Sequence, residues 1–151
     1  MSSTLIPPPL VALLVAASMW AVDAALPGAR VIVPLRTAIV VLLSAVALAL
    51  MVAAVAALWR ARTTVNPLHP ERASALVTDG IFARSRNPIY LGDVLLLAAW
   101  AVWLGNVAAA PLPALFVLWM ARLQIPAEEA ALRAHFGAAF EDYCRRVRRW
   151  L

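Results

Sequence analysis

Four long hydrophobic segments alternate with polar stretches along the chain, at residues 8–26, 37–59, 88–104 and 107–125. The second segment has no charged residue between Arg36 and Arg60. As a helix it would be roughly 35 Å long, which is enough to cross a hydrocarbon core of about 30 Å with some tilt. The pattern therefore predicts an all-α integral membrane protein with four transmembrane helices.

The last two hydrophobic segments are predicted to form a tight helical hairpin. Residues 94–121 carry no charge, and a single helix of that length would overshoot the bilayer by roughly 10 Å. Gly105 and Asn106, followed by Pro111 and Pro113, interrupt the run near its middle. Such residues commonly end one helix and begin the next.

The distribution of arginines predicts which ends of the helices face the cytoplasm. Five arginines lie in residues 60–90 and five more lie after residue 125, whereas the first connection holds only Arg30 and Arg36 and the hairpin tip holds none. Because cytoplasmic loops are enriched in basic residues, both arginine-rich segments are expected inside. We therefore expect four spans with both termini in the cytoplasm.

Composition excludes most other classes of protein. Hydrophobic residues make up 64% of the chain and charged residues 14%, against about 45–50% and 25% in soluble domains. The net charge of +5 is explained by arginine-rich loops that face anionic lipid head groups. We therefore expect membrane lipids and no nucleic acid as partners. The N-terminus has no basic region typical of a signal peptide, so the first span is expected to be retained.

Two polar segments on the cytoplasmic side are candidates for function. Residues 60–90 form a loop of about thirty residues, and loops this long are commonly functional or disordered. Residues 126–151 predict an amphipathic helix on the inner leaflet. Its apolar positions are Leu132, Phe136, Phe140, Tyr143 and Val147. Together these segments suggest a cytoplasmic pocket, but they do not name a reaction.

A few residues in these segments could carry chemistry. Asp93 lies near the start of the third span, where an acidic group needs a partner or a water-filled cavity. Glu128 and Glu129 follow Pro126 and also suit an ordinary helix N-terminus. No set of residues has metal-ligand spacing, so we expect no metal. No glycine-rich nucleotide fingerprint is present, so any cofactor site is not of the Rossmann type.

An ordered series of sequence blocks occupies about the last 90 residues. The blocks are LVTDGIF at 76–82, RNPIYLG at 86–92, Glu128-Glu129, FGAAFEDY at 136–143 and RRVRRWL at 145–151. In this order they resemble the isoprenylcysteine carboxyl methyltransferases and the related membrane phospholipid methyltransferases. The resemblance implies one membrane domain over 1–151, with two N-terminal spans in 1–59 and a methyltransferase core in 60–151. It also implies that S-adenosylmethionine binds in a cytoplasmic pocket.

The resemblance implies a role for eleven residues. Those expected to bind the cofactor are Leu76, Val77, Gly80, Phe82, Asn87, Pro88, Tyr90, Glu128 and Glu129. Asn87 stands where the family most often has histidine, so it can donate a hydrogen bond but cannot titrate near neutral pH. Gln124 falls where eukaryotic members place an arginine that meets the substrate carboxylate. Arg122, two residues earlier, is the other candidate catalytic residue, although on a helix it points about 200° away.

The expected function is therefore methyl transfer to a lipophilic acceptor, most directly the carboxyl group of an isoprenylcysteine-like substrate. A carboxylate acceptor needs no base, whereas an amine must lose a proton. The matched blocks contain no histidine base, which favours an oxygen or sulfur nucleophile. The alternatives are a phospholipid or amine N-methyltransferase and a non-catalytic membrane scaffold or transport subunit. The arginine- and alanine-rich composition predicts a prokaryotic inner-membrane protein, whose oligomeric state the sequence leaves open.

Overall fold

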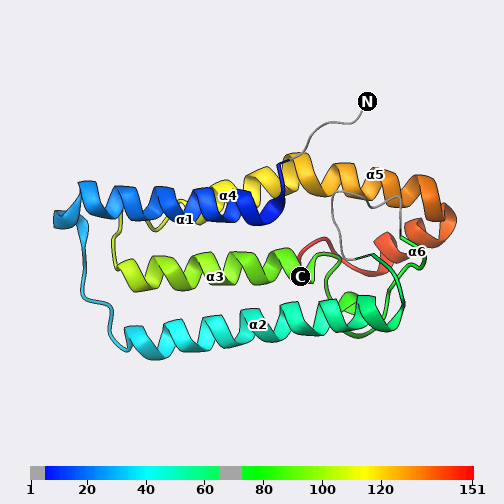
Figure 1. Cartoon of the computed structure of the whole chain (residues 1–151), viewed down its shortest axis with the longest axis horizontal. Helices are drawn as coiled ribbons and strands as arrows, with labels where there is room; N and C mark the ends of the chain where they lie inside the picture. Colours follow the sequence, from blue (N-terminus) through cyan, green and yellow to red (C-terminus); the bar gives the residue numbers. More distant parts are fainter. Residues whose placement is uncertain (1–5, 65–72) are drawn as a thin grey trace.

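The computed structural model describes residues 6–64 and 73–151, and its regular elements there are helices (Figure 1). The α-helices are α1 (Pro8–Ala25), α2 (Arg36–Arg60), α3 (Pro88–Leu104), α4 (Pro113–Trp119), α5 (Ile125–Phe136) and α6 (Ala138–Arg146). The described residues also form two 3₁₀ turns, η1 (Pro27–Ala29) and η3 (Gly80–Ala83), and one π-helical segment, η4 (Met120–Gln124). The all-helical class is thus confirmed. Residues 65–72 of the predicted polar loop lie outside the described residues.

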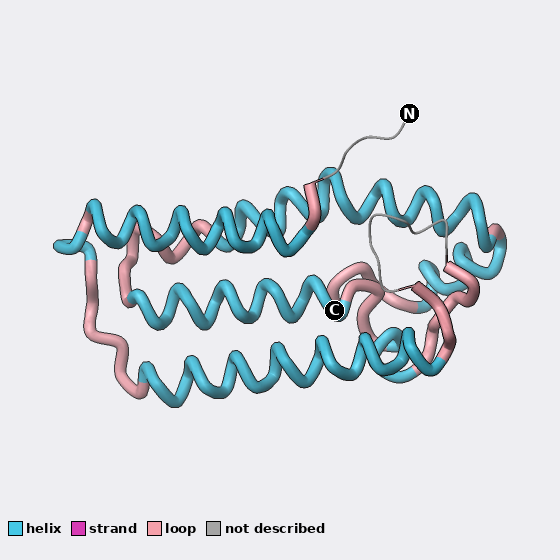
Figure 2. Tube along the Cα trace, viewed as in Figure 1, coloured by secondary structure: helices cyan, strands magenta, loops and turns pink. Residues whose placement is uncertain are grey.

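The long helices lie side by side along the longest axis of the molecule. In Figure 1, α3 runs between α2 on one side and the row formed by α1, α4 and α5 on the other. α3 packs against α1, α2 and α4. Figure 2 shows that the connecting loops gather at the two ends of this bundle. α1 and α2 are long and apolar enough to cross a membrane, while α3 is a shorter apolar helix; the number of spans stays a prediction.

Small residues bring α2 and α3 together. Ala47 and Ala54 are fully buried on α2, and Gly92 is buried on α3. A Cβ atom added to Gly92 would lie 2.5 Å from Cγ of Met51 and 3.2 Å from the carbonyl oxygen of Ala47. Helices in membranes commonly approach one another through such small residues. Gly92 therefore sets the distance between these two helices.

The fourth predicted span differs from the structure. Residues 107–112 form turns, and α4 begins only at Pro113. The helix then continues through η4 into α5 without a loop, although Pro126 lies in its path. Proline lacks an N–H and its ring crowds the carbonyl four residues earlier. The wider π-helical turn just before Pro126 accommodates it, so residue 125 is not the end of a helix.

The predicted C-terminal amphipathic helix is two helices. Gly137 has φ 54° and ψ −127°, a backbone conformation that glycine adopts far more readily than other residues. The chain therefore turns back after α5, and α6 follows. Phe140, Tyr143 and Val147 are buried against the polar loop and the end of α2. The sequence predicted this apolar face correctly, but the face covers protein instead of lying on the inner leaflet.

A polar cluster joins the two connections at the other end of the bundle. Asp23 is 5% exposed and accepts hydrogen bonds of 2.8 and 2.6 Å from Nε and Nη2 of Arg30. The Nδ2 group of Asn106 donates to the same carboxylate at 3.1 Å and to the carbonyl oxygen of Leu26 at 2.9 Å. The α1–α2 loop is thereby fixed to the tip of the α3–α4 connection.

We expect Gly92→Ala to lower the free energy of unfolding by about 1–3 kcal/mol, because the added methyl group must displace Met51 or the α2 backbone. Gly28→Ala is the matched control, since no atom lies within 4 Å of the added Cβ. Thermal unfolding of the purified protein in detergent measures both variants. Equal melting temperatures would show that the α2–α3 distance does not depend on Gly92.

Candidate functional site

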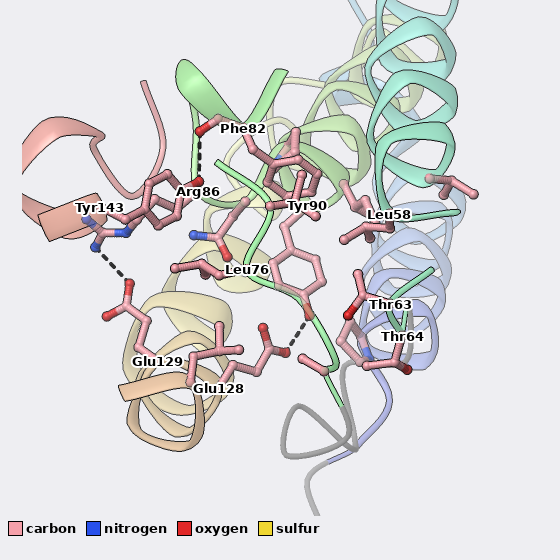
Figure 3. Close-up of a pocket in the computed structure, with 18 of the residues that line it drawn as sticks. Leu58, Thr63, Thr64, Leu76, Phe82, Arg86, Tyr90, Glu128, Glu129 and Tyr143 are labelled. Atoms are coloured by element: carbon pink, nitrogen blue, oxygen red, sulfur yellow. Dashed lines mark hydrogen bonds and ion pairs between the residues drawn. The ribbon is translucent and has the colours of Figure 1, made fainter. Parts of the chain in front are cut away.

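A cavity of about 380 Å³ lies at the end of the bundle where the polar loop, α5 and α6 meet α2 and α3. Its volume is in the range of small-molecule sites, which is roughly 300–1,000 Å³. One part of the wall is apolar and includes Leu58, Leu76, Val77, Phe82, Leu132 and Phe140. Figure 3 shows the polar part, in which side chains from α3 and α5 point toward one another.

Glu128 lies on α5 and is held by two donors. The hydroxyl of Tyr90 on α3 donates to Oε1 of Glu128 at 2.5 Å, and Nε2 of Gln124 donates to the same oxygen at 2.6 Å (Figure 3). Burial raises the pKa of Glu128 to about 7, although these hydrogen bonds lower it in part. Glu128 is therefore a carboxyl group that can exchange a proton near neutral pH.

Glu129, the next residue, is part of a buried ion cluster. Nη2 of Arg86 donates to its Oε1 at 2.8 Å, and Nη2 of Arg149 donates to its Oε2 at 2.6 Å. The side chains of Arg86 and Glu129 are only 13% and 12% exposed. Burial alone would raise the pKa of Glu129, but the hydrogen bonds from Arg149 and Arg86 outweigh it and lower the pKa. Glu129 is thus an ionised structural partner.

Arg86 and its neighbours also hold the C-terminal segment in place. Nη1 of Arg86 donates to the carbonyl oxygens of Val147 at 2.7 Å and Cys144 at 3.2 Å. Nδ2 of Asn87 donates to the carbonyl oxygen of Arg149 at 2.8 Å. The amide group of Asn87, expected to contact the cofactor, therefore already binds the backbone of the C-terminal segment.

The structure brings eight of the eleven predicted site residues to the cavity wall: Leu76, Val77, Phe82, Asn87, Pro88, Tyr90, Glu128 and Glu129. The other three lie elsewhere. Gly80 begins η3 with a positive φ of 57° and does not line the cavity. Gln124 is fully buried and reaches the cavity only through Glu128. Arg122 is exposed and lies outside the cavity wall.

Arg86 and Thr63 are among the polar residues of this wall that sequence reasoning missed. Arg86 stands at the start of the RNPIYLG block, which was the available signal, but its partners are more than forty residues away in the sequence. Thr63 accepts a hydrogen bond from the backbone N–H of Ser74 at 3.1 Å and thereby anchors the loop to the end of α2. A threonine after a helix gives no signal of its own.

Comparisons with known proteins identify the family of the chain. The sequence model of the phospholipid methyltransferase family matches residues 35–139, more than half of the chain. The chain therefore belongs to the phospholipid methyltransferase family. An uncharacterized protein of Haemophilus influenzae is 41% identical over 63 residues, which cover 42% of this chain and the whole of that protein. No solved structure matches the chain.

Two further relatives have functional names. Protein-S-isoprenylcysteine O-methyltransferase of Schizosaccharomyces pombe is 41% identical over 73 residues, 48% of this chain and 30% of that protein. Probable protein-S-isoprenylcysteine O-methyltransferase of Oryza sativa subsp. indica is 34% identical over 98 residues, 62% of this chain and 49% of that protein. The matches thus span half or less of these two relatives.

We expect Glu129→Gln to lower the free energy of unfolding by about 3–5 kcal/mol, because it leaves the buried charge of Arg86 without a counter-ion. Glu141→Gln is the matched control: its exposed pair with Arg133 contributes about 0–1 kcal/mol. Thermal unfolding in detergent measures both, and hydrogen exchange reports whether the C-terminal segment loosens. A similar small loss in both variants would contradict the structural role of Glu129.

Glu128 predicts a pH dependence of stability. Its pKa is raised from about 4.5 in the unfolded chain to about 7 in the folded protein, so the folded state binds more protons between these values. Stability therefore falls as pH rises from 4.5 to 7 and levels off above. We expect Glu128→Gln to remove this decline, as measured by the difference in melting temperature between the two proteins across this range. A parallel decline in both would rule out Glu128 as its cause.

Proposed function

We propose that this member of the phospholipid methyltransferase family transfers a methyl group from S-adenosylmethionine to a lipophilic acceptor. The observation that carries the proposal is the cavity itself. It combines an apolar wall with the half-buried carboxyl group of Glu128, and eight residues expected to bind the cofactor line it. The family and the names of the two methyltransferase relatives support the same chemistry.

The donor set of the cavity fits this cofactor. Leu76, Val77 and Phe82 offer an apolar surface for the adenine ring, and Glu128 offers negative charge for the cationic end. Oε1 of Glu128 receives both hydrogen bonds, so Oε2 has none within the described residues. When bound, the cofactor supplies an electrophilic methyl group on a positively charged sulfur atom.

The protein's own residues orient the reactants and exclude water. Tyr90 and Gln124 hold the Glu128 carboxylate in one position. Phe82, Phe140 and Tyr143 close one side of the cavity and are nearly fully buried. Methyl transfer is a displacement that needs no further covalent chemistry. Much of its rate enhancement can therefore come from holding the donor and the acceptor in line with each other in a site that excludes water.

A lipophilic acceptor is supported by the position of the cavity. Its wall includes Pro8 at the start of α1 and Met51 and Val55 in the C-terminal half of α2, and both helices are candidate membrane spans. An apolar tail can therefore lie against these helices while its head group reaches Glu128. We also propose a prokaryotic inner-membrane location with the cavity on the cytoplasmic side, which the arginines near the cavity support.

Two acceptor groups are consistent with this proposal. The names of the yeast and rice relatives support a carboxyl group on an isoprenylcysteine-like acceptor. The name of the family supports an amine on a phospholipid. The non-catalytic alternative, a membrane scaffold or transport subunit, differs from both because it requires no affinity for the cofactor.

Isothermal titration with S-adenosylhomocysteine tests the proposal. We expect the purified protein to bind it, and Phe82→Ala to weaken binding about tenfold or more, because an aromatic side chain that stacks on a base contributes about 1–3 kcal/mol. Glu141→Gln changes an exposed carboxyl group outside the cavity and is expected to bind normally. Absence of binding by the folded wild-type protein would favour the scaffold alternative.

A further inference from the structure

We propose that Asp93 determines which acceptors enter the cavity. Its carboxylate binds a neutral hydrogen-bond donor, a hydroxyl or an amide N–H, at the junction between the reacting group of the acceptor and its apolar tail. It excludes acceptors that carry a phosphate at this junction. The inference rests on the function proposed above and narrows its acceptor by one chemical feature.

Asp93 lies on the wall of the cavity, one helical turn along α3 from Tyr90. It is the sixth residue of α3 and is half-buried. Residues three apart lie on nearly the same face of a helix, with a rise of about 4.5 Å between them, and both of these side chains line the cavity. Because Tyr90 donates to Glu128, Asp93 lies about one turn beyond the place proposed for the cationic end of the cofactor.

The packing of α3 against α2 places Asp93 beside the apolar part of the wall. Gly92, the preceding residue, is so close to Met51 of α2 that an added Cβ would lie 2.5 Å from its Cγ. Met51 and Val55 line the cavity, and α2 carries no charge between its two terminal arginines. Asp93 is therefore at the level where the tail of the proposed acceptor passes along α2.

The carboxyl group of Asp93 has no protein partner. Within the described residues its side chain makes neither a hydrogen bond nor an ion pair. The other charged groups of the described wall do have partners, since Arg86 is paired with Glu129 and Glu128 accepts from Tyr90. An acidic group on an apolar helix needs a partner or water, and a donor on a bound molecule can replace that water.

The position of Asp93 decides which part of the acceptor it meets. The reacting group is proposed to lie near Glu128 and the tail against Met51 and Val55, so Asp93 faces the junction between them. In a phospholipid this junction carries a negatively charged phosphate, which a carboxylate repels strongly in a desolvated site. A hydroxyl or an amide N–H would instead donate to the carboxylate and offset the cost of desolvating it.

The described wall has no spare cation to offset this repulsion. Its one arginine is Arg86, whose Nη1 donates to the carbonyl oxygens of Cys144 and Val147 and whose Nη2 donates to Glu129. Nε of Arg86 is buried without a partner and does not reach solvent. A phosphate beside Asp93 would therefore have to compete with Glu129 for Arg86, whereas a neutral donor would not.

The test compares three probes that share one dodecyl chain and differ at the junction: N-dodecylacetamide, dodecyl methyl phosphate and dodecyl methyl ether. Their binding to the full-length protein is measured by calorimetry at about pH 8, in micelles of an uncharged polyoxyethylene detergent and without a methyl donor. We expect the wild-type protein to bind the amide about tenfold or more tightly than the phosphate. Since every variant is measured in the same micelles, ratios between variants do not depend on how each probe partitions.

Two substitutions separate the charge of Asp93 from its hydrogen bond. Asp93→Asn keeps an acceptor oxygen and removes the charge, so the phosphate is expected to bind about tenfold or more tightly than to the wild-type protein, while amide binding changes little. Asp93→Leu also removes the acceptor, so the amide is expected to bind as weakly as the ether. Asp79→Asn is the matched control, because it removes an exposed carboxylate outside the cavity wall and is expected to change none of the three.

Two results would overturn the inference: a phosphate that binds Asp93→Asn no more tightly than the wild-type protein, or a wild-type protein that binds ether and amide equally. Melting temperatures in detergent check that each variant folds, and Asp93→Asn, which keeps the shape of the side chain, decides the matter if Asp93→Leu does not fold. Failure of the wild-type protein to bind S-adenosylhomocysteine would instead overturn the proposed function. Normal binding of S-adenosylhomocysteine, with unchanged affinity for the phosphate in Asp93→Asn, would overturn the role of Asp93 alone.

Discussion

The cavity depends on one buried ion cluster, in which Glu129 is paired with Arg86 and Arg149. A charge can be buried only if it is paired and hydrogen-bonded, and each partner here comes from a different part of the chain. Arg86 precedes α3, Glu129 lies on α5 and Arg149 belongs to the C-terminal segment. Because neither Arg86 nor Glu129 can be desolvated without a partner, the cluster joins these segments and closes one side of the cavity.

Two adjacent glutamates have opposite roles because of the helix that carries them. Successive residues of an α-helix point about 100° apart, so Glu129 faces the arginines while Glu128 faces Tyr90 and the cavity. The orientation of α5 is in turn set by η4, which lies directly before Pro126. The π-helical turn also places Gln124 one turn below Glu128, where its amide completes the carboxyl group's support.

The sequence predicted what depends on local pattern and missed what depends on distant partners. Hydrophobic runs predicted the long helices, and the ordered blocks predicted eight of the residues that line the cavity. The sequence did not predict the continuous helical run from α4 to α5, because proline usually ends a helix. It also did not predict the turn at Gly137, because a glycine within a helix usually only destabilises that helix. Arg86 was passed over because its partners, Glu129 and the carbonyl oxygens of Cys144 and Val147, become visible only when the tail folds back.

The polar cluster at the other end of the bundle bears on how the protein is inserted. In the orientation proposed here, the α1–α2 loop must be translocated across the bilayer together with Arg30 and Arg36. Arg30 forms a bidentate ion pair with Asp23, and the guanidinium of Arg36 lies 5.0 Å from the ring centroid of Trp103. Translocation of this helical hairpin therefore carries an arginine already neutralised by a carboxylate on the preceding helix, which lowers the electrostatic barrier that an isolated arginine would meet.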